Sequence, residues 1–213
     1  MTLTNPFDNF ENAAHYEAWY QTDGRWADHQ EKSLLKWLLS HFPTAHSILE
    51  AGCGTGHFTR WFEKEGMHVS GLDLSRSMLK AAKGFGSRLL IQGDAANLPF
   101  APNSFDIIAM ITTLEFLPDP ISALIEGRRI ARQGFILGVI NKHGLVGMKY
   151  KRNGGPIWEA AQFYSPTELK KMLRKTFDSQ AAFSWRTTLW PLIPWYLPLP
   201  WGGFIGMAIK WKK

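Results

Sequence analysis

The sequence lacks the features that define several protein classes. It has one cysteine in 213 residues, so no disulfide can form within the chain. No stretch reaches the roughly 20 uninterrupted apolar residues of a membrane-spanning helix, and the nearest one, 189–209, is broken by four prolines and three glycines. The first residues show no basic start followed by an apolar run. We therefore expect a cytoplasmic protein and not a secreted one.

Repeats and metal-ligand patterns are missing as well. The seven histidines show no paired spacing of the kind that zinc sites use, so we predict no metal. The net charge of +6 is modest and suits an anionic substrate, a nucleic acid or a membrane surface, so it selects none of them. A chain of this length and apolar content is typical of one α/β domain with a well-filled core.

The most informative stretch is 47–74, which reads SILEAGCGTGHFTRWFEKEGMHVSGLDL. Its apolar start leads into glycines at alternate positions, which let the backbone turn sharply and bring bare N–H groups against a ligand. A helical pattern follows, and then a second apolar strand that ends at Asp73. An acid at that point can accept hydrogen bonds from both hydroxyls of a ribose. The stretch therefore predicts a nucleoside site.

A nicotinamide dinucleotide is disfavoured at this site. The dinucleotide fingerprint GxGxxG would need its third glycine where this chain has His57. The acidic Glu50 beside the turn would repel a pyrophosphate but would attract a ligand that carries an ammonium and a sulfonium. The run Glu50-Ala51-Gly52-Cys53-Gly54-Thr55-Gly56 resembles motif I of the class I S-adenosylmethionine-dependent methyltransferases.

The resemblance is continuous from about residue 47 to 141 and is strongest to the ubiquinone-biosynthesis-like, or type 11, branch of that family. It implies an α/β, Rossmann-like sheet of seven strands, mixed because the last strand is antiparallel, with helices on both faces in three layers. It also implies that Asp94 accepts from the adenine amino group of S-adenosylmethionine while the N–H of Ala95 reaches a ring nitrogen. The cofactor residues that it implies are Glu50, Ala51, Gly52, Cys53, Gly54, Gly56, Asp73, Leu74, Asp94, Ala95 and Thr112.

An N-terminal helix is expected to close over the cofactor, as in the resembling family. Residues 10–39 read as helical with a break at 22–24. Tyr16, Trp19 and Arg25 are candidates to contact the ligand, and Arg25 offers a guanidinium fork for a carboxylate. The alternative is that these aromatic residues only pack the helix onto the sheet.

Two residues are candidates for a general base. Glu115 follows the fourth expected strand and His143 follows the fifth, so both should lie near the transferred methyl group. Glu115 could instead pair with the cofactor ammonium, and His143 could be a surface histidine. Pyrimidine C5 methylation is excluded because it needs a cysteine nucleophile and Cys53 lies in the glycine turn. The chain has Thr112-Thr113-Leu114-Glu115 where methyltransferases of exocyclic base amines have Asn/Asp-Pro-Pro-aromatic.

We divide the single domain, 1–213, into an N-terminal helical cap (1–40), a cofactor core (41–140), a basic substrate-side cap (141–164), and a C-terminal helix and strand pair (165–213). Between the last two strands lies a proline-aromatic segment, 190–201, a candidate lid. It should cover the acceptor, a partner chain or a membrane surface, or else pack on its own domain.

We expect a methyltransferase of a small, apolar or aromatic acceptor. The alternatives are an RNA or protein methyltransferase, suggested by the basic cap, and a non-catalytic cofactor-binding scaffold. Nucleic acid is not favoured as a partner, peripheral membrane contact is an option, and the oligomeric state is left open.

Overall fold

The computed structural model describes residues 7, 17–153, 158, 161–177, 180–190 and 193–212. Seven strands form one sheet in the order β3-β2-β1-β4-β5-β7-β6. Their bounds are β1 Ser47–Ala51, β2 His68–Asp73, β3 Leu90–Gln92, β4 Phe105–Ile111, β5 Ala131–Ile140, β6 Ala181–Thr188 and β7 Phe204–Trp211. Strand β7 runs antiparallel to both of its neighbours, β5 and β6, while β1 to β5 pair in parallel. The predicted mixed sheet is confirmed.

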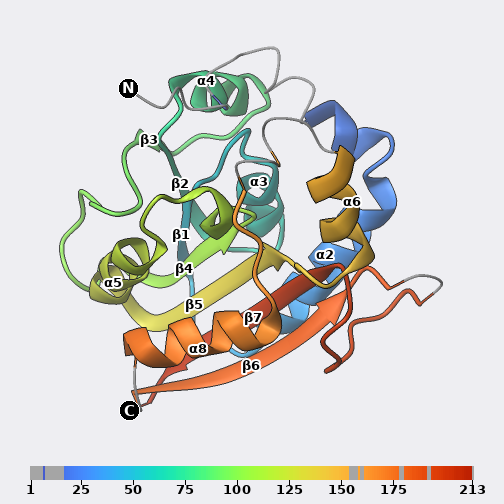
Figure 1. The fold of residues 1–213 in the computed structure, drawn as a ribbon. Coiled ribbons are helices and arrows are strands. Elements are labelled where there is room, and N and C mark those ends of the chain that lie inside the picture. The colour runs from blue at the N-terminus through green and yellow to red at the C-terminus, as the bar shows by residue number, and fades with distance from the viewer. Residues whose placement is uncertain are drawn as a thin grey trace.

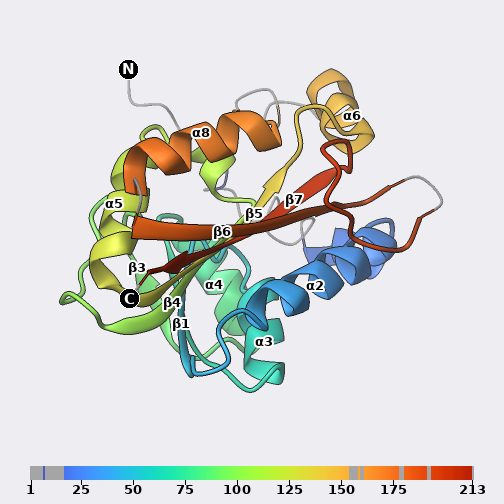
Figure 2. The same ribbon diagram turned by 90° about the horizontal axis from the view of Figure 1, so that it is seen from below.

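Helices cover both faces of this sheet, so the domain has the three predicted layers (Figures 1 and 2). Helices α2 and α3 lie on one face, α5 and α8 on the other, and α4 packs beside β2 and β3. The bounds are α2 Arg25–Leu39, α3 His57–Lys64, α4 Arg76–Gly84, a 3-10 turn η1 Leu114–Phe116, α5 Pro120–Ile130, α6 Leu145–Asn153 and α8 Pro166–Phe177. Within the described part of the chain, no helix combines the length and apolarity needed to cross a membrane.

The apolar periodicity of the sequence explains which faces are buried. Strand β4 is apolar at nearly every position and is buried on both sides at 106–111, as expected for a central parallel strand. On α2, the leucines 34, 35 and 38 are fully buried against the sheet. On the opposite face, leucines 124, 169 and 173 from α5 and α8 close the second core cluster. The sheet is therefore held between two well-packed layers.

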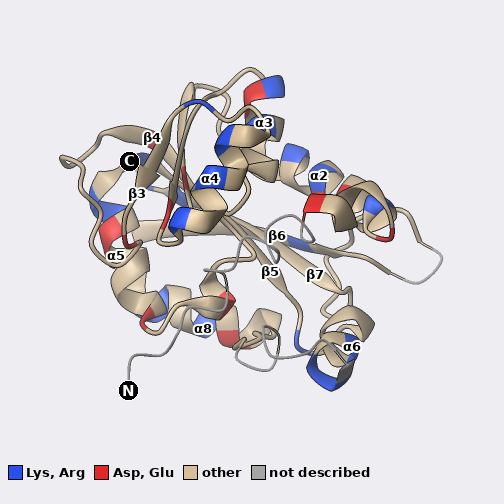
Figure 3. Ribbon diagram, turned by 90° about the horizontal axis from the view of Figure 1, so that it is seen from above, with Lys and Arg blue, Asp and Glu red and all other residues tan. Residues whose placement is uncertain are grey.

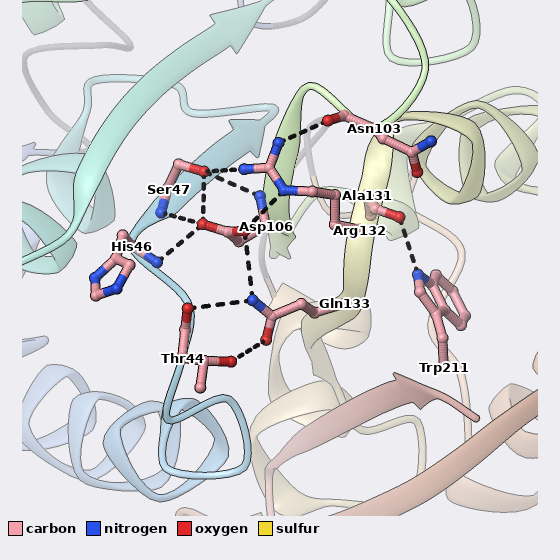
Figure 4. A network of polar contacts seen from close by, with 9 residues as sticks. All are labelled: Thr44, His46, Ser47, Asn103, Asp106, Ala131, Arg132, Gln133 and Trp211. Atoms are coloured by element: carbon pink, nitrogen blue, oxygen red, sulfur yellow. Dashed lines mark hydrogen bonds and ion pairs between the residues drawn. The ribbon is translucent and has the colours of Figure 1, made fainter. Parts of the chain in front are cut away.

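The amino-terminal edge of the sheet is held by one polar network around Asp106 (Figure 4). The Asp106 carboxylate accepts from the Nε of Arg132 at 2.9 Å and from the backbone N–H groups of His46 and Ser47 at 3.0 Å each. Burial would raise the pKa of Asp106, but these donors hold it well below its usual range. The network ties together the starts of β1, β4 and β5.

The same network includes the start of β5, at Arg132 and Gln133. Helix α5 ends at Ile130, and β5 begins at once with Ala131. Arg132 and Gln133 are thus strand residues, and their side chains reach Asp106. Their hydrogen bonds to Asp106 join the start of β5 to the start of β4.

The stretch expected to be a basic cap contains a helix, α6. Its start packs on the turn that precedes β7, because the Asn141 Nδ2 donates to the carbonyl oxygens of Pro200 and Gly202, both at 2.7 Å. The proline-aromatic segment leaves β6 at the end of the sheet that also carries the glycine turn. It then folds back on β6, since Thr187 and Leu197 exchange backbone hydrogen bonds of 2.9 Å.

Candidate functional site

A cavity of about 620 Å³ opens at the carboxyl ends of β1, β2 and β4. Open α/β sheets bind their ligands at this edge. Its described lining combines the glycine turn, four carboxylates and a set of apolar and aromatic side chains, and it includes no lysine or arginine. The carboxylates are those of Glu50, Asp73, Asp94 and Glu115. The cavity therefore favours neutral or cationic groups over anionic ones.

The glycine turn has the geometry that its spacing predicts. Gly52, Gly54 and Gly56 have φ values of 77°, 52° and 74°, in the left-handed region that favours glycine. The turn is fixed by the N–H groups of Gly52 and Cys53, which donate to the Leu72 carbonyl at 2.7 and 3.0 Å. A Cβ on Gly54 would meet no atom of the described residues within 4 Å, although Gly54 lines the cavity. The space beside Gly54 is open to a ligand.

Asp73 connects the end of β2 with this turn. One carboxylate oxygen accepts from the Gly54 N–H at 2.8 Å, and the other accepts from the Ser75 N–H at 2.8 Å. A carboxylate oxygen can accept more than one hydrogen bond, so a carboxylate fixed in this way suits the hydroxyls of a ribose. The neighbouring Leu74, another predicted cofactor residue, lines the cavity and is 58% exposed.

Glu50 lies at the bottom of the cavity and is 1% exposed. Burial raises its pKa to about 8, against the effect of a short hydrogen bond from the Thr59 hydroxyl. Near pH 7 a cationic group beside Glu50 would favour the ionised carboxylate and lower this pKa. The same burial raises the pKa of the Cys53 thiol, which keeps it neutral.

Three further predicted residues line the cavity: Asp94, Ala95 and Thr112. Asp94 closes a local turn, where its carboxylate accepts from the Ala96 N–H at 2.9 Å. Thr112 has a φ of 51°, which is rare for a β-branched residue and costs about 1–3 kcal/mol. Such strain gathers at functional sites, and here it turns the chain sharply after β4.

Glu115 follows on η1 and is the one base candidate that lines the cavity. Its Oε1 accepts from the Ile140 N–H at 2.6 Å, and its Oε2 is buried without a partner among the described residues. Burial raises the pKa of Glu115 to about 8.

Five other predicted residues do not line the cavity, and one of them is Trp19, whose ring lies against Gly24 and Tyr20. His143 is exposed beyond a turn in which its N–H donates to the Asn141 Oδ1, and Arg25 is exposed at the start of α2. Ala51 is buried in β1. Gly56 precedes α3, and a Cβ on Gly56 would clash with the side chain of Ser87. Tyr16 lies outside the described residues.

The cavity also contains residues that the sequence did not indicate: Phe7, Tyr20, His57, Phe58, Phe116 and Gln162. The Tyr20 and His57 rings stack with centroids 3.7 Å apart. The His57 Nε2 lies 2.6 Å from the Asp28 Oδ1 of α2. The one available signal was His57 itself, which stands at the third glycine position of the dinucleotide pattern.

A second contact joins the N-terminal residues to the glycine turn. The Thr55 hydroxyl donates to the Glu17 carboxylate at 2.6 Å, and Arg60 pairs with the same carboxylate at 2.5 Å. Burial would raise the pKa of Glu17, but hydrogen bonds from His57 and Thr55 and the charge of Arg60 lower it to about 2. The N-terminal segment is thus held over the turn by charged hydrogen bonds as well as by aromatic packing.

Comparison with known proteins agrees with this geometry. A family model for a methyltransferase domain, type 11, matches residues 49–138. A crystal structure of a methyltransferase from Thermotoga maritima, described as S-adenosylmethionine-dependent and as a possible histamine N-methyltransferase, is 28% identical with a TM-score of 0.81, covering 97% of this chain and 98% of that one. Residues 49–138 thus form a methyltransferase domain, and the chain has the fold of this S-adenosylmethionine-dependent methyltransferase.

Curated relatives match this methyltransferase domain over part of their length. A malonyl-[acyl-carrier protein] O-methyltransferase of Pectobacterium atrosepticum is 38% identical over 47% of this chain and 41% of the relative. A demethylmenaquinone methyltransferase of Staphylococcus haemolyticus is 31% identical over 63% of this chain and 55% of the relative. The chain thus spans only about half the length of these relatives.

The residues at the cavity fit S-adenosylmethionine. Gly54 leaves open space beside bare backbone, and Asp73 presents a fixed carboxylate for the ribose. Glu50 offers a buried carboxylate for the ammonium of the methionine part, and Asp94 with Ala95 lines the wall where the adenine would be held. A ligand with two positive centres suits this acidic wall.

Proposed function

We propose that the chain is a methyltransferase that moves the methyl group of S-adenosylmethionine to a small, apolar or aromatic acceptor that is neutral or cationic. The observation that carries this proposal is the composition of the cavity. In this proposal the cofactor contacts Glu50, Asp73 and Asp94. Glu115 and the aromatic lining residues beside Phe116 then remain to contact the acceptor. An acceptor in contact with this wall meets apolar carbon, one carboxyl group and no lysine or arginine of the described lining.

The residues of the chain have two tasks in this reaction. S-adenosylmethionine supplies a methyl group already activated on a sulfonium, so correct alignment provides much of the acceleration. The aromatic wall holds the acceptor and excludes water. When a hydroxyl or an amine forms its new bond to carbon, it must lose a proton, and the Glu115 carboxylate is placed to take it.

Relatives support a small acceptor without identifying it. The curated relatives are named for malonyl-[acyl-carrier protein] and for demethylmenaquinone, and the Thermotoga maritima protein is described as a possible histamine N-methyltransferase. An RNA substrate is disfavoured because a phosphate backbone requires cationic partners, whereas the described cavity wall presents carboxylates.

The test is an acceptor screen that measures S-adenosylhomocysteine production. We expect turnover with an arylalkylamine or a phenol and none with the arylcarboxylate of matched size. Turnover with RNA or a protein and with no small molecule would overturn the proposal.

Glu115→Gln sharpens the same test. It should lower kcat by about 10²-fold or more and leave S-adenosylhomocysteine affinity within about twofold, because a general base acts on the chemical step. In the unmodified enzyme, kcat/KM should rise with pH toward about 8, where the Glu115 carboxyl ionises, and the variant should lose that rise. An unchanged pH profile would remove Glu115 from the role of base.

A further inference from the structure

Exposed apolar residues gather at one end of the molecule, away from the cavity. Of the twelve large hydrophobic side chains that are exposed in the described part of the chain, six belong to α6 and the proline-aromatic segment. They include Trp195 at 70%, Trp201 at 62% and Leu145 at 60% exposure. The others are Met148, Ile193 and Leu199. We call these six residues the apolar end patch.

The two parts of this patch belong to one surface. Helix α6 and the proline-aromatic segment lie at the same end of the molecule in Figures 1 and 2. The hydrogen bonds from Asn141 to Pro200 and Gly202 join their bases, and the backbones of Gly144 and Gly203 approach too closely for a Cβ on Gly144. No described residue of 190–201 lines the cavity, so the segment does not cover the cofactor site there.

Positive charge lies beside the patch, on α6. Helix α6 presents the exposed Lys149, Lys151 and Arg152 and no acidic residue, as the blue bands on α6 in Figure 3 show. No ion pair engages these three side chains among the residues that the structure describes. The sequence ranges 142–158 and 186–213 contain no aspartate or glutamate at all.

We infer that the apolar end patch docks on an anionic lipid membrane, with its tryptophans at the interface and the basic residues of α6 against the head groups. Tryptophan is favoured at this depth because its ring is apolar and its N–H is polar. Each lysine or arginine near an anionic bilayer adds attraction. The prolines of 190–201 keep the apolar side chains presented without regular structure behind them.

The same charge disfavours the other occupants. A second copy of the chain related by a two-fold axis would bring one basic α6 close to the other, and like charges repel. A nucleic acid would use the lysines and arginine but would leave six large apolar side chains exposed. Anionic lipid alone is complementary to both parts of the surface.

The experiment is co-sedimentation of the full chain with vesicles of phosphatidylcholine alone and of phosphatidylcholine with phosphatidylglycerol. We expect binding to the anionic vesicles, weakened by salt because the attraction is partly electrostatic. The double variant Trp195→Ser, Trp201→Ser should bind at least about tenfold more weakly, and Lys149→Glu, Lys151→Glu should lose the preference for anionic lipid by a similar factor.

Matched controls distinguish the effect of the apolar end patch from that of any exposed tryptophan or any surface charge. Trp26→Ser removes a tryptophan that is 49% exposed on α2, and Lys64→Glu, Lys83→Glu reverses two exposed charges on α3 and α4. These variants should bind vesicles as the unmodified protein does. All variants should retain S-adenosylhomocysteine affinity, which reports a folded domain and keeps this test independent of the acceptor.

The inference fails if neither kind of vesicle binds the protein. It also fails if the tryptophan and charge variants bind like their controls. A dimer seen by analytical ultracentrifugation that the Trp195→Ser, Trp201→Ser variant abolishes, with no vesicle binding, would assign the patch to a second copy instead.

Discussion

The amino and carboxyl ends of the strands form two edges of the sheet, and each edge carries buried carboxylates in a different environment. At the amino edge, the Asp106 carboxylate is saturated by donors from β1 and β5, and its pKa is lowered. At the carboxyl edge, Glu50 and Glu115 are buried with few partners, and their pKa values are raised to about 8. A saturated carboxylate stabilises the fold, whereas a carboxylate left short of donors is available to a ligand. The comparison teaches which edge contributes stability and which contributes binding.

The largest expected effect is at Gly54 on the binding edge. Gly54→Val should abolish S-adenosylhomocysteine binding in calorimetry, since a branched side chain would occupy the open space beside the turn. The matched control is Gly66→Val, where φ is also positive, at 90°, and a Cβ also meets nothing within 4 Å. Both should lose about 1–2 kcal/mol of stability, and only Gly54→Val should lose the ligand. Equal binding by the two would misplace the site.

Asp73→Ala should weaken S-adenosylhomocysteine binding by about 1.5–3 kcal/mol, because two ribose hydroxyls lose a charged acceptor. The Gly54 and Ser75 N–H groups lose their acceptor as well. Asp73→Asn keeps the shape of the side chain and one acceptor oxygen. Its affinity for S-adenosylhomocysteine should therefore lie between those of the unmodified protein and of Asp73→Ala. Detectable binding of NAD by any of these proteins, stronger than that of S-adenosylhomocysteine, would contradict the cofactor assignment.

Asp106→Ala tests the structural edge. It leaves the Arg132 guanidinium and two backbone N–H groups without their acceptor, so urea unfolding should show a loss of about 2–3 kcal/mol. Cofactor affinity should stay within about 0.5 kcal/mol, as expected for distant sites. A variant that is stable but no longer binds would show that the two edges are not separate.

The pH dependence of stability is predicted as a slope, and its effect within any one pH unit is smaller than the losses predicted above for Asp73→Ala and Asp106→Ala. Burial raises the pKa of Glu31 from 4.5 to about 8, so the folded state keeps a proton that the unfolded state releases between those values. The free energy of unfolding should therefore fall as pH rises from about 5 to 8, by at most about 1.4 kcal/mol per pH unit for each such group.

Glu31→Gln should make the slope of the unfolding free energy against pH shallower, because one group that titrates on unfolding is removed. Urea titrations across this pH window measure that slope. The control is Glu126→Gln, since hydrogen bonds from Arg129 hold the pKa of Glu126 below its usual value and it carries no proton in either state there. A slope unchanged by Glu31→Gln would mean that water or a counter-ion reaches this carboxylate.

Local chemistry explains what the sequence could predict. The glycine turn and Asp73 depend on neighbours within a few residues or on one strand-helix-strand unit, and both are present. The buried β4 and the order of the elements follow from apolar periodicity for the same reason.

Contacts between distant segments explain what it could not. His57 meets Asp28, 29 residues earlier in the chain, and Phe116 meets Phe7. His143 looked well placed after β5, but the Asn141 side chain bonds to Pro200 and Gly202 and the chain turns away before His143 reaches the cavity. The spacing of residues along the sequence does not determine which distant residue a side chain contacts, or in which direction the chain turns after a strand.

The position of the tryptophans also determines what an optical experiment would report. The chain has ten tryptophans, yet none is among the described residues that line the cavity, while Trp195 and Trp201 stand mostly in solvent. Filling the cavity should leave the emission spectrum almost unchanged. Transfer of the apolar end patch into a less polar medium should shift tryptophan emission to shorter wavelength. The intrinsic fluorescence of this protein should therefore report changes at its outer surface more strongly than binding of the cofactor.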